Sequence, residues 1–131
     1  MAWTGRPAPV YAHYGVTHRC NMRCRMCAVW KSGSAAAELT VAQAGRLARG
    51  LWAAGVRSIA LGGGEPSVRR DLPELVAAFS GLGMDVRLLT NGVQVSYELI
   101  DELALAGLRH VSVSLDSLEP SKERDIYGGR D

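Results

Sequence analysis

Three cysteines stand close together near the start of the chain, and they are the residues best suited to bind a metal. Cys20, Cys24 and Cys27 form the pattern CxxxCxxC, and the 131 residues contain no other cysteine. Thiolates are the usual ligands of iron–sulfur clusters, and four of them normally hold a four-iron cluster. Three thiolates would leave one iron open, and an open metal position is where a bound molecule reacts. The spacing therefore predicts a four-iron four-sulfur cluster with a free coordination site.

The sequence around these cysteines is also compatible with two other interpretations. They could bind zinc, with His18 or His13 as a fourth ligand, although zinc ligands usually come as two separated pairs. They could also be unrelated buried cysteines, although their confinement to one short segment argues against this. Positive charge favours the thiolate form that a metal requires. Three arginines lie beside the cysteines in the sequence and are expected to supply it: Arg19, Arg23 and Arg25.

Polar motifs follow three later apolar segments of the chain. They are Gly63-Gly64-Glu65-Pro66, Thr90-Asn91-Gly92, and the pair Ser114 and Asp116. Glycine lets a backbone approach a ligand closely, and a carboxylate accepts hydrogen bonds from a charged amino group or from ribose hydroxyls. Each motif also has a purely structural interpretation, as a tight turn, an Asn-Gly turn or, for Asp116, the N-cap of the next helix.

The elements that position these motifs alternate regularly along the chain. Four strands are predicted from their β-branched and apolar residues, at 9–17, 56–61, 84–89 and 108–115. Helices are predicted to begin at Thr40, which forms a capping-box pattern with Gln43, at Asp71, at Ser96 and near Pro120. This alternation predicts right-handed crossovers and a parallel sheet. Because ligands bind at the carboxyl ends of parallel strands, the four motifs are expected to face one mouth.

The motifs and their order resemble those of the radical S-adenosylmethionine (SAM) superfamily. The resemblance extends from about Val10 to Gly129 and includes the end of the sequence, SLDSLEPSKERDIYGG. It implies a TIM-like partial βα barrel, of which this chain contains about four βα units. Residues 1–131 are then expected to form one core domain, with 32–37 as a flexible connector within it.

The resemblance also implies the cofactors, a [4Fe-4S] cluster on Cys20, Cys24 and Cys27 and SAM on the open iron. Reductive cleavage of SAM would give a 5′-deoxyadenosyl radical that abstracts hydrogen from a substrate, with a reductant such as flavodoxin or ferredoxin. Met26 departs from the family pattern, which usually has an aromatic residue there. The positions expected to contact SAM are Met26, Gly63, Gly64, Glu65, Asn91, Ser114 and Asp116.

Composition excludes some classes of function. The net charge is only +2 and no segment is a dense run of lysine and arginine, so nucleic-acid binding is not indicated. The first residues lack the layout of a signal peptide, and no apolar segment approaches the roughly 18 residues of a membrane span. We therefore expect a cytoplasmic protein that does not bind a membrane.

The length of the chain bears on what it can do alone. A closed barrel needs around 250 residues, so we expect an N-terminal part of a longer enzyme that is inactive alone, with an apolar inner face partly exposed. Arg87, His110 and Ser112 are candidates for the barrel interior. The substrate, a peptide or a small molecule, is not readable, and a non-catalytic iron–sulfur or zinc-binding module is the alternative.

Overall fold

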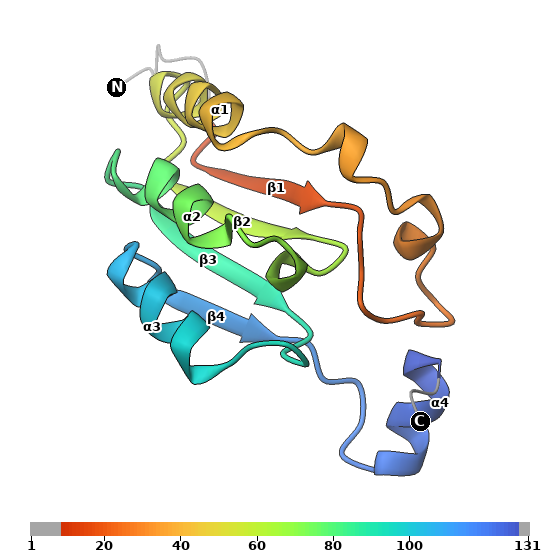
Figure 1. The fold of residues 1–131 in the computed structure, drawn as a ribbon. Coiled ribbons are helices and arrows are strands. Elements are labelled where there is room, and N and C mark those ends of the chain that lie inside the picture. Colours follow the sequence, from red (N-terminus) through yellow and green to blue (C-terminus); the bar gives the residue numbers. More distant parts are fainter. Residues whose placement is uncertain (1–8, 129–131) are drawn as a thin grey trace, which may run out of the picture.

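The computed structural model describes residues 9–128, which form a four-stranded parallel sheet with helices between the strands (Figure 1). The strands lie in the order β1 (Tyr11–Thr17), β2 (Ser58–Gly63), β3 (Asp85–Thr90) and β4 (His110–Val113). The helices are α1 (Val41–Ala53), α2 (Leu72–Ser80), α3 (Tyr97–Leu105) and α4 (Pro120–Tyr127). The predicted alternation of strands and helices in a parallel sheet is confirmed. Residues 1–8 and 129–131 of the predicted 1–131 domain lie outside the described part.

Two of the predicted helix starts are confirmed by their hydrogen bonds. Thr40 accepts from the Gln43 N–H at 3.2 Å, while the Gln43 side chain accepts from the Thr40 N–H at 2.8 Å. The Ser96 hydroxyl accepts from the N–H of Leu99 at 3.2 Å. These bonds satisfy amide groups that a helix leaves unpaired in its first turn.

The predicted start of α2 at Asp71 is confirmed, but the capping bond that an aspartate usually makes at this position is absent. Both carboxylate oxygens instead accept from Arg69, at 2.9 Å from Nε and 2.6 Å from Nη2. A charged, two-pronged partner outcompetes a backbone N–H for the carboxylate.

Helices α1 to α3 cover one face of the sheet, and the hydrophobic core lies between these helices and the sheet. Strand residues alternate, so that side chains such as Ile59, Leu61 and Leu88 point toward the helices and are fully buried. They meet apolar side chains of α2, among them Leu75 and Phe79. The hydrophobic core therefore packs against only one face of the sheet.

The opposite face of the sheet is mainly polar, and the expectation of an apolar inner face is wrong. Its side chains, in register from strand to strand, include His13, Asp85, Arg87, His110 and Ser112. His110 pairs with Asp85 at 3.3 Å. The three candidates for the barrel interior, Arg87, His110 and Ser112, all lie on this face.

All four strands point toward one edge of the sheet, where the cysteine loop and α4 lie (Figure 1). The C-terminal end of α4 contacts the loop, because the Arg25 N–H donates to the Ile126 carbonyl at 3.0 Å. Gly128 follows with φ +76°, and a side chain there would collide with the carbonyl of Arg23. The carboxyl edge of the sheet thus carries the segments predicted to bind cofactor.

Three short 3-10 helices lie in the connections, η1 (Val29–Ser32), η2 (Ala35–Ala37) and η3 (Pro66–Val68). The segment 32–37 therefore contains η2 and the end of η1, and its flexibility stays a prediction. Strand β4 is shorter than the predicted range 108–115. Within residues 9–128, no helix combines the length and apolar character needed to cross a membrane.

Candidate cofactor site

One cavity of about 320 Å³ gathers residues from four segments far apart in the sequence. Its walls come from the cysteine loop, the turn after β2, the end of β3 and the segment after β4. All ten residues predicted from the motifs line it: Cys20, Cys24, Met26, Cys27, Gly63, Gly64, Glu65, Asn91, Ser114 and Asp116. The structure thus brings these residues together, while their individual roles stay predictions.

The glycine turn after β2 fits tightly against the start of the cysteine loop. The Gly64 N–H donates to the carbonyl of Thr17 at 2.7 Å, and the Glu65 N–H donates to the carbonyl of Arg19 at 2.8 Å. Gly63 has φ +120°, and a Cβ at Gly63 or Gly64 would collide with those same two carbonyls. Only glycine allows this approach, so the turn fixes where the residue before Cys20 lies.

Glu65 is buried, and its carboxylate joins the ends of β2 and β3. Its Oε1 accepts from the Ser67 N–H at 3.1 Å, the Ser67 hydroxyl at 2.6 Å and the Thr90 hydroxyl at 2.6 Å. Its Oε2 accepts from the Asn91 N–H at 2.7 Å. Oε2 receives a single bond from the protein and so retains capacity for a ligand, while Oε1 holds the ends of the two strands together.

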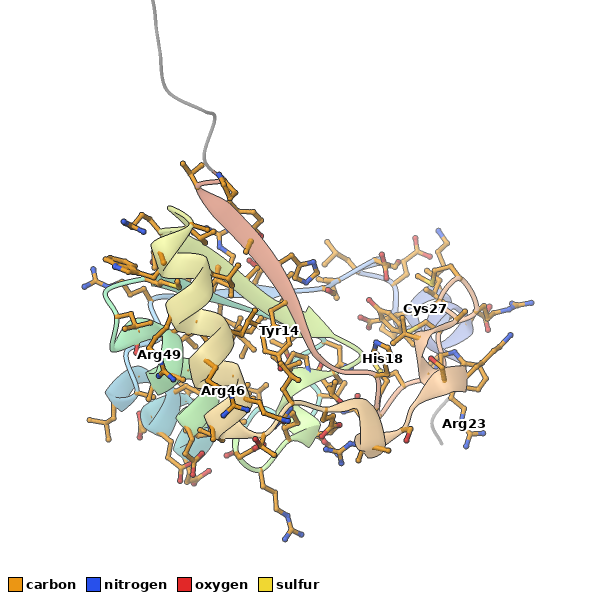
Figure 2. All side chains as sticks on the ribbon, turned by 90° about the horizontal axis from the view of Figure 1, so that it is seen from above. Tyr14, His18, Arg23, Cys27, Arg46 and Arg49 are labelled. Carbon is orange, nitrogen blue, oxygen red and sulfur yellow. The ribbon has the colours of Figure 1, made fainter. Side chains whose placement is uncertain are left out.

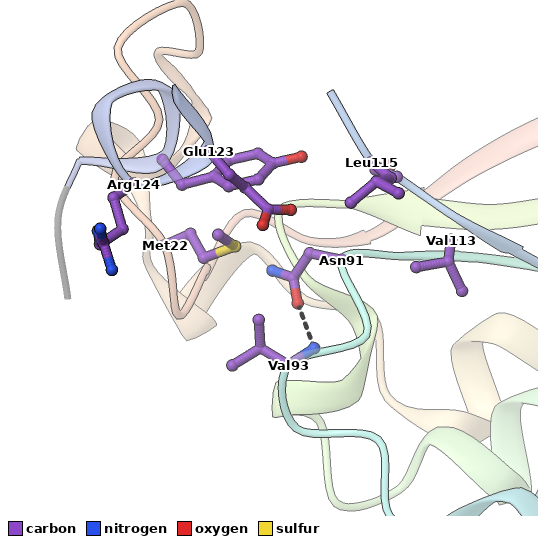
Figure 3. A pocket seen from close by; sticks show the side chains of 9 residues that line it. Met22, Asn91, Val93, Val113, Leu115, Glu123 and Arg124 are labelled. Carbon is purple, nitrogen blue, oxygen red and sulfur yellow. Dashed lines mark hydrogen bonds between the residues drawn. The ribbon is translucent and has the colours of Figure 1, made fainter. Parts of the chain in front are cut away.

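Asn91 links the end of β3 to the cysteine loop through Asn21. The Asn91 Oδ1 accepts from the Val93 N–H at 3.0 Å (Figure 3), which leaves its Nδ2 to donate to Asn21 Oδ1 at 2.7 Å. The orientation of the Asn21 amide follows, because its oxygen must face Asn91. Its Nδ2 is buried and has no partner among the described residues. A buried donor directly after Cys20 therefore lacks an acceptor from the protein.

A second cavity, of about 290 Å³, adjoins the first (Figure 3). The two share Met22, Asn91, Ser114 and Tyr127. Its remaining walls come from the end of β4, the loop after β3 and α4: Val93, Val113, Leu115, Glu123 and Arg124. Like the first cavity, it is walled mainly by apolar atoms.

The three thiols are free, and Cys24 is partly buried. Burial raises the pKa of the Cys24 thiol, and the neighbouring Cys20 raises it further. The expectation that the flanking arginines favour the thiolate is therefore wrong for Cys24. Arg23 and Arg25 are exposed, and the guanidinium of Arg19 is bonded to Glu38.

Glu38 is a site residue that the sequence did not reveal. Its carboxylate accepts from the Thr17 hydroxyl at 2.5 Å and from Arg19 Nε at 2.7 Å and Nη2 at 3.1 Å. Arg69 stands behind it and donates to the carbonyls of Val16 and Leu39, at 2.8 and 3.0 Å. No motif surrounds Glu38, because its partners are set by the fold and not by neighbours in the chain.

The segment after β4 also reaches the cavity. The Ser114 N–H donates to the Thr90 carbonyl at 2.9 Å, and the Asp116 N–H donates to the Tyr127 hydroxyl at 3.1 Å. Burial, and then hydrogen bonding to Asp116, raise the pKa of Tyr127. The interpretation of Asp116 as a helix cap is wrong, since Glu119 occupies the N-cap position of α4. Tyr127 also lines the cavity. It was not predicted as a site residue because it lies far from the motifs in the sequence.

The residues present fit a multi-iron cluster by the chemistry of their donors. Within residues 9–128, no three His, Cys, Asp or Glu side chains are arranged to hold a single metal ion. The three free thiols instead line one cavity together, and ligands of a cluster can each bind a different iron. The unpartnered Asn21 amide adds a donor of the kind that hydrogen-bonds to cluster sulfur.

The fold and the site define a parallel βα protein with its cofactor residues at the carboxyl edge of the sheet. The family model of the radical SAM superfamily matches residues 14–131, so the chain belongs to this superfamily. The cofactors of the family are a [4Fe-4S] cluster and SAM.

Curated relatives from bacteria share more than a third of the aligned residues. The PqqA peptide cyclase of Methylobacterium sp. (strain 4-46) is 36% identical over 125 residues, which are 95% of this chain and 33% of that protein. The GTP 3′,8-cyclase of Marinobacter nauticus is 40% identical over 119 residues, 88% of this chain and 36% of that protein. The chain thus spans about a third of the length of these relatives.

Solved structures show the same fold at lower identity. Streptococcus suis SuiB bound to S-adenosylmethionine has a TM-score of 0.78 and 21% identity, and the match covers 94% of this chain and 27% of SuiB. BtrN in complex with AdoMet and 2-DOIA has a TM-score of 0.71 and 20% identity, covering 93% of this chain and 52% of BtrN.

Proposed function

We propose that Cys20, Cys24 and Cys27 hold a [4Fe-4S] cluster and that the adjoining cavity binds SAM for radical generation. The single observation that supports this best is that the three thiols line one cavity with all seven residues predicted to contact SAM. Bound in this way, the cluster would deliver an electron to SAM, whose cleavage gives the 5′-deoxyadenosyl radical that abstracts hydrogen from a substrate.

The remaining residues would bind and orient SAM. Glu65 Oε2, which accepts from one protein donor, would accept from the ammonium group of SAM. Asp116 and Ser114 would accept hydrogen bonds from the ribose hydroxyls of SAM, or their backbone groups would bind its carboxylate. Met26 and the backbone of Gly63 and Gly64 complete the wall that SAM would contact.

The substrate would approach from the polar face of the sheet. That face ends at the cofactor cavity, and it carries side chains able to hydrogen-bond, including His13 and Arg87. The names of the relatives include both a peptide cyclase and a GTP cyclase. A peptide or a small molecule is accordingly proposed as substrate, and flavodoxin or ferredoxin as reductant.

Anaerobic reconstitution with iron and sulfide tests the proposal. We expect a brown protein whose absorbance and electron paramagnetic resonance spectra change when SAM is added. A brown protein indifferent to SAM would instead identify a non-catalytic iron–sulfur module. A colourless protein with bound zinc would identify a zinc-binding domain and overturn the proposal.

A further inference from the structure

An aromatic ring with two cations close to it lies against the cysteine loop. The indole N–H of Trp30 donates to the carbonyl oxygen of Cys24 at 3.3 Å, so the ring lies directly against the loop. The guanidinium carbon of Arg23 lies 5.8 Å from the centroid of this ring, and the Nζ of Lys31 lies 5.6 Å from it. Arg23, Trp30 and Lys31 are called the basic patch below.

The two cations of the basic patch are available to a partner. Both side chains are exposed, and neither takes part in an ion pair within the described part of the chain. Arg23 lies at the end of the molecule that carries Cys27 and His18, far from Arg46 and Arg49 on α1 (Figure 2). Positive charge without an ion-pair partner among the described residues thus lies beside the cysteines.

Cys24 connects the cavity to the basic patch. It lines the cavity, while its carbonyl meets the Trp30 indole. The three patch residues are not part of the cavity wall, so a molecule in the cavity would leave them free to contact a protein. An electron that enters at the patch would reach Cys24, a proposed cluster ligand, through the Trp30 side chain.

We infer that the basic patch is the docking site of an acidic one-electron carrier protein. The inference rests on the proposed function, since the electron is destined for the cluster on Cys24. One electron leaves the reduced carrier and enters the cluster, so that the carrier is oxidised and the cluster reduced, and no bond is made or broken. Complementary charge steers such encounters and raises their rates about 10- to 1,000-fold at low salt.

Stopped-flow reduction of the reconstituted chain tests this docking site. The probe is fully reduced flavodoxin, and bleaching of the cluster absorbance gives the rate constant. The double variant Arg23→Glu with Lys31→Glu should be reduced by flavodoxin at least about tenfold more slowly than the unaltered chain. The rate for the unaltered chain should fall with added salt, because salt screens exposed charges.

Two controls separate docking from general effects. Arg46→Glu with Arg49→Glu makes the same change in net charge on α1 and should leave the flavodoxin rate nearly unchanged. Reduced methyl viologen, a small cation, should reduce the patch variant as fast as the unaltered chain. If the charge-reversed chain does not fold, Arg23→Gln with Lys31→Gln takes its place and should slow flavodoxin in the same direction.

The outcomes distinguish the docking site from the proposed function. An unchanged flavodoxin rate in the patch variant, or an equal loss in the α1 variant, would overturn the docking site alone. A chain that binds no cluster, or whose cluster ignores SAM after reduction by methyl viologen, would overturn the proposed function. Slower reduction by flavodoxin, with normal reduction by methyl viologen, supports the inference.

Discussion

Arg19 and Glu38 are joined by two hydrogen bonds at the base of the cysteine loop, from Nε to Oε1 at 2.7 Å and from Nη2 to Oε2 at 3.1 Å. Cys20 directly follows Arg19, so Glu38 holds the residue from which the loop departs. On the other side, the Arg19 carbonyl accepts from the Glu65 N–H. The first cysteine is therefore placed by an ion pair and by the glycine turn together.

Replacing Glu38 by glutamine should loosen this arrangement without removing its bulk. We expect the free energy of unfolding at pH 7 to fall by about 1–2 kcal/mol, the lower part of the usual cost of losing a bond to a charged group. We expect a free-energy change in the lower part of the range because the Arg19 side chain is 39% exposed and water screens the ion pair. Urea unfolding measures the change. Glu74→Gln, on the exposed side of α2, is the matched control and should cost little.

The same pair predicts how stability depends on pH. Hydrogen bonding to Arg19 holds the pKa of Glu38 below its ordinary value. The stabilisation is therefore complete above the unfolded pKa of about 4.3, and it is lost as the pH falls through the lower folded value. The unaltered chain should lose stability more steeply between about pH 5 and pH 3 than Glu38→Gln. Parallel curves for the two chains would contradict this role of Glu38.

Each cysteine should be needed for the cluster. If each of them binds a different iron, replacing Cys20, Cys24 or Cys27 by alanine removes a ligand that the others cannot supply. We expect iron and sulfide per chain to fall to a small fraction of the unaltered value after anaerobic reconstitution. Met26→Leu, in the same loop, should retain full iron content. Full iron content in Cys24→Ala would rule out the ligand assignment.

Glu65 and Asp116 should respond differently to alanine. Glu65 accepts four bonds from Ser67, Thr90 and Asn91, so Glu65→Ala leaves buried donors unpaired and should cost about 3 kcal/mol or more in stability. Asp116 is exposed, and Asp116→Ala should leave stability unchanged. Its effect should appear in SAM affinity, weaker by roughly 10- to 100-fold with the cluster intact. Urea unfolding measures the loss of stability in each variant. Titration with SAM, monitored by electron paramagnetic resonance, measures the loss of SAM affinity.

Much of the site could be predicted because it depends on local patterns. The cysteine spacing, the glycines and the polar ends of strands are readable in order, and a parallel sheet necessarily brings them to one edge. What the spacing could not show is how Glu65 is used. The sequence suggested a ligand contact, whereas the structure shows a carboxylate that also binds the ends of β2 and β3.

Residues that act through distant partners escaped prediction for a physical reason. Glu38 directly follows the segment 32–37, which was predicted to be a flexible connector, and its partners come from β1 and from the start of the cysteine loop. Asp71 had the position of a helix cap, but Arg69 competes for the same oxygens. In both residues, the choice between a local and a tertiary hydrogen bond depends on the folded backbone.

The outer edge of the sheet leads to a prediction about association. In the described part of the chain, β4 pairs on one side only, with β3. An edge strand presents free N–H and C=O groups to other chains. Apolar side chains on and after β4 are exposed as well, with Val113 at 61% and Leu115 at 57%. We therefore expect the 131-residue chain, produced by itself, to self-associate through β4.

Charge placed on this edge should suppress the association. Val113→Lys adds a positive charge to an exposed position of β4, and edge lysines oppose pairing between sheets. Light scattering at increasing concentration should show larger species for the unaltered chain than for Val113→Lys. Leu105→Lys is the matched control, since Leu105 is 90% exposed but lies on α3, where no strand edge is available. If Leu105→Lys reduced the scattering as much as Val113→Lys, general solubility and not edge pairing would explain the association, and a monodisperse unaltered chain would show that β4 does not pair at all.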